Sequence, residues 1–255
     1  MSRYIIFFLL GVIIILISIP ISALDKAEDI SLSDVKFKEV KIIPTSESIY
    51  SFIPDSEINE LGKIAFTPDD NMIAYGFSDA EKTIHQKFFA IGNLYANLLT
   101  KLSGKYDKDE VIGMVKALQD GLDNLGASNA IFTYLFNLEN MIASDAYQYD
   151  ILRRFLTMLY PFIEEFSESL GAKISLQAGH WLVDLAIISA AKNEVLIKQS
   201  DTALFFADEY EKLNAPKGVI KSFKEIAQIT SKSSLSIEDY DNIITLSENI
   251  RGFLR

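Results

Sequence analysis

The feature that most constrains the fold is a long region, 78–255, in which apolar side chains recur every three or four residues. The first of these series comprises Ile84, Phe88, Ile91, Tyr95, Leu98 and Leu102. Residues with this spacing lie on one face of an α-helix, which must be buried against other helices. The region therefore predicts an all-α domain in which several amphipathic helices share one core.

Helix-capping residues and prolines divide this region into about eight helices. Ser78 and Glu81 form the Ser-x-x-Glu pattern of a capping box and predict the start of the first helix. Asp107 and Ser128 are N-cap residue types and predict the next two starts. The remaining five helices are expected over about 150–171, 174–196, 201–213, 216–228 and 236–253. Pro161 predicts a kink in the fourth helix.

These helices predict a mainly α fold, a multi-helix orthogonal bundle of about eight helices. A solenoid of helical hairpins is the alternative, because residues 94–104 and 159–171 are alike in outline and each is followed by a further helix. The fifth helix is apolar on most faces, which indicates a central, buried position.

The amino-terminal segment, residues 1–23, indicates the compartment. Arg3 precedes an uninterrupted apolar run from Ile5 to Ile17, and Ser22 and Ala23 provide small residues for cleavage. This order is typical of a secretory signal peptide. A retained membrane anchor is the alternative, because about 20 residues suffice to span a bilayer. Both interpretations place the rest of the chain outside the cytoplasm, in the periplasm or at the cell surface.

Residues 24–77 form a polar spacer that ends in two short apolar runs within residues 62–77. Two apolar runs there flank the turn sequence Thr67-Pro68-Asp69-Asp70-Asn71. The stretch IAFTPDDNMIAYG resembles one that is common in β-propeller blades. A propeller needs such hairpins at intervals of about 40–50 residues, and this chain has one copy. We therefore expect a lone N-terminal β-hairpin over 62–77.

The composition excludes several classes of function. The net charge is −11, from 24 basic and 35 acidic residues, and no Lys/Arg cluster occurs, so the chain is not expected to bind nucleic acid. The chain has no cysteine, which removes disulfides, thiol catalysis and Cys-ligated metals. Phosphate-binding loops, dinucleotide fingerprints and hydrolase motifs are also absent from the sequence. No cofactor and no enzymatic activity are expected.

The two histidines of the chain each share a helix face with a carboxylate. His85 follows Glu81 by four residues, and His180 precedes Asp184 by four. If their helices are neighbours, Glu81, His85, His180 and Asp184 are candidates for one divalent metal site. Two separate polar pairs, each satisfied locally, are the alternative.

A second candidate site is a groove for an apolar ligand. The chain contains 17 Phe and 11 Tyr. This is more aromatic side chains than the core-facing sides of the helices can hide. Gly179, His180, Trp181 and Asp184 are the candidate lining, because glycine allows close approach and Trp181 is the lone indole.

Together these features predict an exported, non-enzymatic helical module that acts by interaction or as a scaffold. The expected partner is another envelope protein, with association at the inner membrane if the N-terminal segment is retained. An extracytoplasmic protein that binds a small ligand or a metal is the alternative function.

Overall fold

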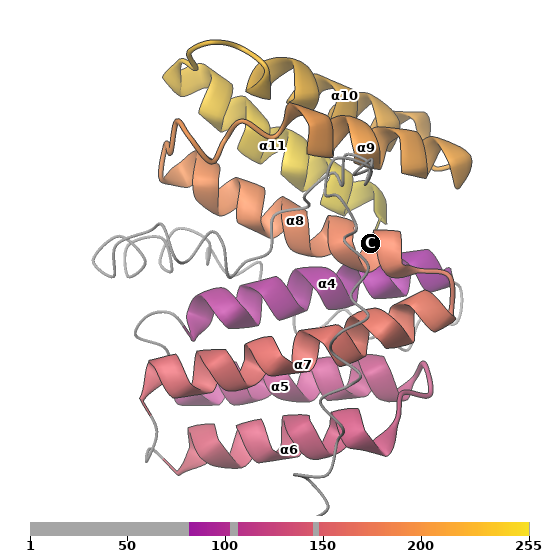
Figure 1. The fold of residues 1–255 in the computed structure, drawn as a ribbon, viewed down its shortest axis with the longest axis vertical. Helices are drawn as coiled ribbons and strands as arrows, with labels where there is room; N and C mark the ends of the chain where they lie inside the picture. Colours follow the sequence, from indigo (N-terminus) through magenta and orange to yellow (C-terminus); the bar gives the residue numbers. More distant parts are fainter. Residues whose placement is uncertain (1–81, 103–106, 145–147, 255) are drawn as a thin grey trace, which may run out of the picture. The chain divides into compact units, whose positions relative to one another are not determined.

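The computed structural model describes residues 82–102, 107–144 and 148–254. All of these residues belong to one compact unit of the chain. These residues contain eight α-helices and no strand (Figure 1). The mainly α fold and the number of helices are therefore confirmed for this part of the chain. The predicted signal or anchor, the polar spacer and the hairpin at 62–77 lie outside it.

The helix boundaries follow the sequence signals closely. The helices are α4 (Ile84–Lys101), α5 (Lys108–Asp123), α6 (Asn129–Ala143), α7 (Tyr149–Ser169), α8 (Lys173–Ala190), α9 (Ser200–Lys212), α10 (Lys217–Thr230) and α11 (Ile237–Leu254). At the start of α5 the Asp107 carboxylate accepts a hydrogen bond from the Glu110 backbone N–H at 3.0 Å, as an N-cap does. Helix α7 continues through Pro161.

Two helix boundaries differ from the predicted ones. The capping box that opens α4 is formed by Thr83 and Gln86, whereas the predicted one at Ser78 lies outside the described residues. Helix α8 ends at Ala190, not near residue 196 as predicted. Lys192 adopts a left-handed φ of 49°, and the Asn193 side chain accepts hydrogen bonds from two following backbone N–H groups. Such an Asx turn competes with the helix and stops it before the apolar residues that resume at Val195.

The centre of the described domain is the pair α4 and α8, which pack along each other (Figure 1). Their closest approach is at Gly92 and Gly179. A Cβ atom added to Gly92 would lie 2.0 Å from the carbonyl oxygen of Leu176, and one added to Gly179 would lie 2.1 Å from that of Phe89. Only glycine allows backbones this close. Because α8 is buried on nearly all sides, its predicted central position is confirmed.

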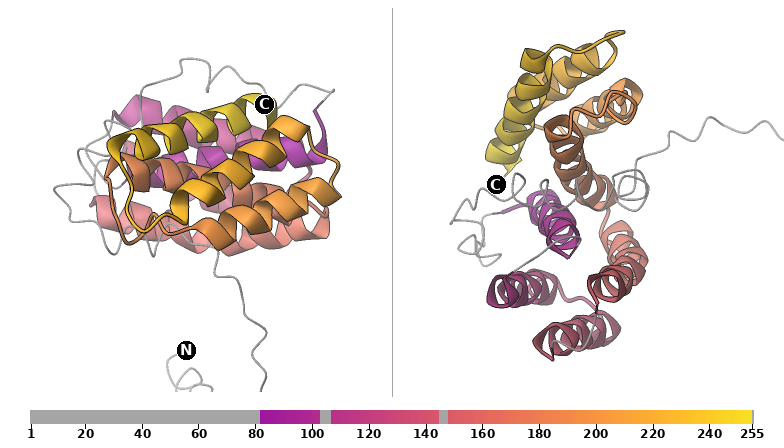
Figure 2. Two further views of the ribbon diagram at one scale, coloured as in Figure 1. Left: turned by 90° about the horizontal axis from the view of Figure 1, so that it is seen from above. Right: turned by 90° about the vertical axis from the view of Figure 1, so that its left-hand side faces the viewer.

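The other helices extend the domain on the two sides of this pair. Helices α4 to α7 pack in chain order and return to α8, while α9, α10 and α11 form a second group that closes against α8. Figure 2, in its right-hand view along the helices, shows both groups. The multi-helix bundle is thus as expected, but most helices run alongside one another and not orthogonally, because short connections fold successive helices back antiparallel. The packing of α4 on α8, far apart in sequence, is not what a solenoid predicts.

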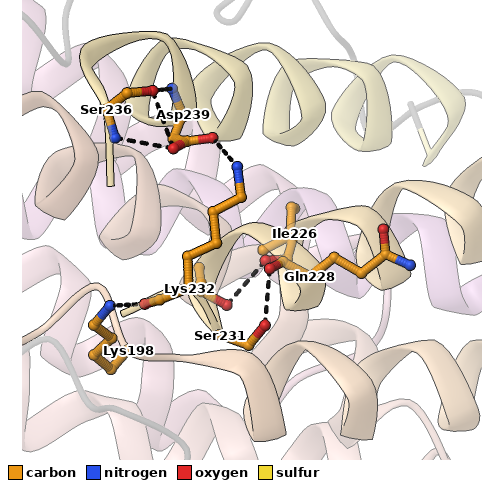
Figure 3. Close-up of polar contacts among 8 residues, drawn as sticks. Lys198, Ile226, Gln228, Ser231, Lys232, Ser236 and Asp239 are labelled. Carbon is orange, nitrogen blue, oxygen red and sulfur yellow. Dashed lines mark hydrogen bonds and ion pairs between the residues drawn. The ribbon is translucent and has the colours of Figure 1, made fainter. Parts of the chain in front are cut away.

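A polar cluster fixes the connection between α10 and α11 (Figure 3). The Asp239 carboxylate accepts hydrogen bonds from Ser236 and from the Lys232 ammonium, the latter at 2.5 Å. The Lys198 ammonium, from the connection between α8 and α9, donates to the carbonyl oxygens of Lys232 and Ser233. This cluster joins two connections at one end of the second helix group.

Candidate functional site

The most unusual polar feature of the described core is a pair of ionisable side chains on α8. His180 and Asp184 lie one helical turn apart, with Nε2 of the imidazole 3.5 Å from Oδ2 of the carboxyl group. Their side chains are 5% and 0% exposed. Ionisable side chains are rarely buried to this degree unless they are paired. The structure thus places the two side chains side by side on one face of α8, and their role as ligand or metal residues stays a prediction.

Two tyrosines from different helices enclose the imidazole. The ring of Tyr95, on α4, lies 5.5 Å from the His180 ring, and the ring of Tyr160, on α7, lies 5.0 Å from it, both edge to face. The Tyr95 hydroxyl donates a hydrogen bond to the Leu156 carbonyl oxygen at 3.0 Å. The pair thus sits where α4, α7 and α8 meet, and its surroundings are mainly aromatic.

Burial sets the protonation of this cluster. It lowers the pKa of His180 to about 3 and raises the pKa of Asp184 well above its usual value. Burial, followed by the nearby Glu164 and Asp184 carboxylates, also raises the pKa of Tyr160. Neither Asp184 oxygen makes a hydrogen bond within the described part of the chain. Both shifts favour the uncharged form of the group, because the core disfavours a charge on either one.

The second histidine, His85, contacts a different residue of α8. His85, in the first turn of α4, places Nδ1 3.2 Å from the hydroxyl oxygen of Ser175 on α8. Glu81 lies outside the described residues. Among the residues described, no group of three or more His, Cys, Asp or Glu side chains is arranged to hold a metal ion. A metal site built from Glu81, His85, His180 and Asp184 therefore remains a prediction.

The four candidate ligand-lining residues point in different directions. Gly179 faces the α4 backbone at Phe89, and His180 faces Tyr95 and Tyr160. Trp181 is 1% exposed. It packs against the rings of Phe206 and Phe223 in the second helix group, with centroids 5.3 and 6.2 Å away. Only His180 and Asp184 are brought together, and the apolar-ligand groove also stays a prediction.

Sequence reasoning missed the groups that surround the pair. The pattern predicts Tyr95 as an ordinary core residue of its helix, and nothing in the sequence links Tyr160 to His180. The two tyrosines come from α4 and α7, and their convergence on His180 depends on how these helices pack against α8. The spacing of His180 and Asp184 within one helix was the only local signal for the cluster.

Comparison with known proteins adds no functional information. No family model matches the chain, and neither a curated protein nor a solved structure is significantly similar to it. Within the described ranges, none of the helices combines the length and the apolar character needed to cross a membrane.

Proposed function

We propose that the chain is an exported, non-enzymatic helical module that acts outside the cytoplasm as an interaction or scaffold protein. Export rests on residues 1–23, as a signal peptide or as an anchor that would keep the module at the inner membrane. The proposed partner is another envelope protein, and the acidic net charge of −11 disfavours nucleic acid. The polar spacer and the hairpin at 62–77 belong to this proposal as an extension that precedes the helices.

The observation that carries the proposal is the contrast between the core and the surface. The side chains best suited to chemistry, His180 and Asp184, are sealed between helices, where a substrate reaches them only if the helices separate. In contrast, bulky apolar side chains are exposed on several helices, including Phe136 at 58% and Ile237 at 65%. Phe136 and Ile237 lie on different helices, α6 and α11, so they offer two separate positions at which a partner could bind.

Two measurements in cells test the proposal. Alkaline phosphatase fused after residue 255 is expected to be active, because it folds only outside the cytoplasm. A photo-reactive amino acid at Phe136 or at Ile237 is expected to give a discrete adduct with another protein. The control is the same amino acid at Lys221, whose side chain is 76% exposed and polar. An inactive fusion, or equal labelling at all three positions, would overturn the proposal.

The alternative function, binding of a small ligand or a metal, is favoured by one observation. Both Asp184 oxygens are buried without a hydrogen bond among the described residues, which is costly for a structural group. Native mass spectrometry of the full chain from its own envelope fraction distinguishes the two functions. A stoichiometric extra mass that disappears in His180→Gln would favour ligand or metal binding, whereas a bare chain would favour the interaction module.

A further inference from the structure

The outward face of α7 carries an apolar stripe. Ile151, Met158 and Phe162 are 46%, 58% and 47% exposed, and Leu170, directly after the helix, is 42% exposed. Because residues four, seven and eleven apart lie on one side of a helix, Ile151, Met158 and Phe162 form a line along α7, which the exposed Ser169 continues. Leu170, at the end of the helix, lies to one side of this line. The helix is buried on its opposite side by Leu152, Leu156, Leu159 and Ile163. We call this line, with the exposed Arg154 and Glu165, the α7 face.

The α7 face is complementary to its own reversed copy. When two α7 helices pack antiparallel around an axis near residue 160, Met158 of each copy lies opposite Phe162 of the other. In the same register Arg154 lies opposite Glu165, and Ile151 lies opposite Ser169. One apolar pair and one ion pair are thereby formed twice, once on each side of the axis.

The charges select this arrangement over its alternatives. In a parallel pair of α7 helices, Arg154 would face Arg154 and Glu165 would face Glu165, which is repulsive. The basic residue lies towards the beginning of the helix and the acidic residue towards its end. Only the antiparallel pairing brings opposite charges together while it keeps the apolar side chains in contact.

We propose that the α7 face binds a second copy of this chain and forms a two-fold symmetric, antiparallel dimer. The occupant is the chain itself, so this inference goes beyond the proposed partner in the envelope and does not depend on it. One helix face on each side buries less surface than most stable complexes. The dimer is therefore expected to dissociate reversibly on dilution.

A charge swap tests the pairing. In the full chain, Arg154→Glu places four acidic side chains across the interface, and Glu165→Arg places four basic ones there. Each single variant is expected to weaken the dimer at least about tenfold, because like charges face each other twice. The double variant Arg154→Glu/Glu165→Arg is expected to restore it. Sedimentation equilibrium gives the dissociation constants, and far-UV circular dichroism checks that each variant is folded.

Lys221→Glu on α10 is the matched control, since it changes charge at an exposed position away from α7 and should leave dimerisation unchanged. A double variant as weak as the single variants would overturn the proposed register. A wild-type chain that stays monomeric at all concentrations would overturn the dimer itself, and would indicate that residues 1–81 or another protein cover the face. Neither result would affect cross-linking at Phe136 or Ile237, so the proposed function is tested separately.

Cysteine cross-linking tests the direction of the two helices. The chain has no cysteine, so introduced thiols report only on the intended positions. A mixture of Ile151→Cys and Ser169→Cys chains is expected to form mixed disulfides, whereas each variant alone should form few. The two positions are about 27 Å apart along one helix at about 1.5 Å per residue, which excludes a bond within one chain. Efficient cross-linking of Ile151→Cys with itself would overturn the antiparallel model.

Discussion

The crossing of α4 and α8 at two glycines makes Gly92→Ala the most informative single change. The new Cβ would lie 2.0 Å from the oxygen and 2.9 Å from the carbon of the Leu176 carbonyl group. Favourable contacts of carbon need about 3.5 Å, so the helices must separate by about 1.5 Å. Both opposing atoms belong to the backbone, and no change of rotamer can relieve the clash.

The expected loss of stability follows from two opposing effects. Overpacking a core costs about 1–3 kcal/mol, and a contact between rigid backbones belongs at the upper end of that range. Alanine is a better helix former than glycine and returns up to about 1 kcal/mol. The net expectation is a loss of about 2 kcal/mol, or about 4–8 °C in Tm for a domain of this size. Urea unfolding followed by circular dichroism and by the fluorescence of Trp181, the single Trp, measures the loss.

Gly113→Ala in α5 is the matched control, because a Cβ added there meets no atom within 4 Å. This substitution should stabilise the protein slightly, because alanine favours the helix more than glycine does and no clash opposes it. Gly179→Ala should behave like Gly92→Ala, since its Cβ would lie 2.1 Å from the Phe89 oxygen. The double variant should cost less than the sum, because helices already separated accept the second methyl group. If Gly92→Ala is as stable as Gly113→Ala, the close crossing is refuted.

Three further predictions concern ionisable groups. His180 has a lowered pKa of about 3, so the folded protein should lose stability as the pH falls from about 6.5, by up to about 1.4 kcal/mol per unit. His180→Gln should remove this dependence in urea titrations at pH 7 and pH 4. Asp184 has a raised pKa, so its contribution to stability declines as the pH rises above about 4. The free energy of unfolding of Asp184→Asn, relative to that of the wild type, should therefore rise with pH. Parallel profiles of unfolding free energy against pH for the two proteins would contradict the raised pKa of Asp184. The hydrogen bond from Lys232, then that from the Ser236 backbone, lowers the pKa of Asp239 to about 2. Asp239→Asn should destabilise the protein at pH 7, and thermal unfolding should show the difference shrinking as the pH falls towards 2.

The helices could be predicted because their signals are local. Asp107 caps α5 through a residue three positions away, and the apolar repeat of each helix is contained in its own sequence. The predicted end of α8 near residue 196 is wrong because apolar residues resume at Val195, whereas a left-handed Lys192 and the Asn193 turn have already stopped the helix. Turn chemistry competes with periodicity there, and the sequence pattern alone does not show which prevails. The mutual packing of the helices depends on distant contacts, such as the Gly92 and Gly179 crossing, which no local pattern specifies.

The candidate site also combines a local signal, the spacing of two residues in one helix, with contacts from distant parts of the sequence. The spacing of His180 and Asp184 predicted a pair, and the pair exists, but spacing is equally compatible with a metal site, a ligand site or a structural contact. What discriminates among these is burial and the identity of the neighbours, Tyr95 and Tyr160, which come from other helices. Burial disfavours a charge on either His180 or Asp184, so the state of the pair depends on how closely α4, α7 and α8 enclose it. The α7 face is of the opposite kind, because it combines exposed apolar side chains with a self-complementary order of charges.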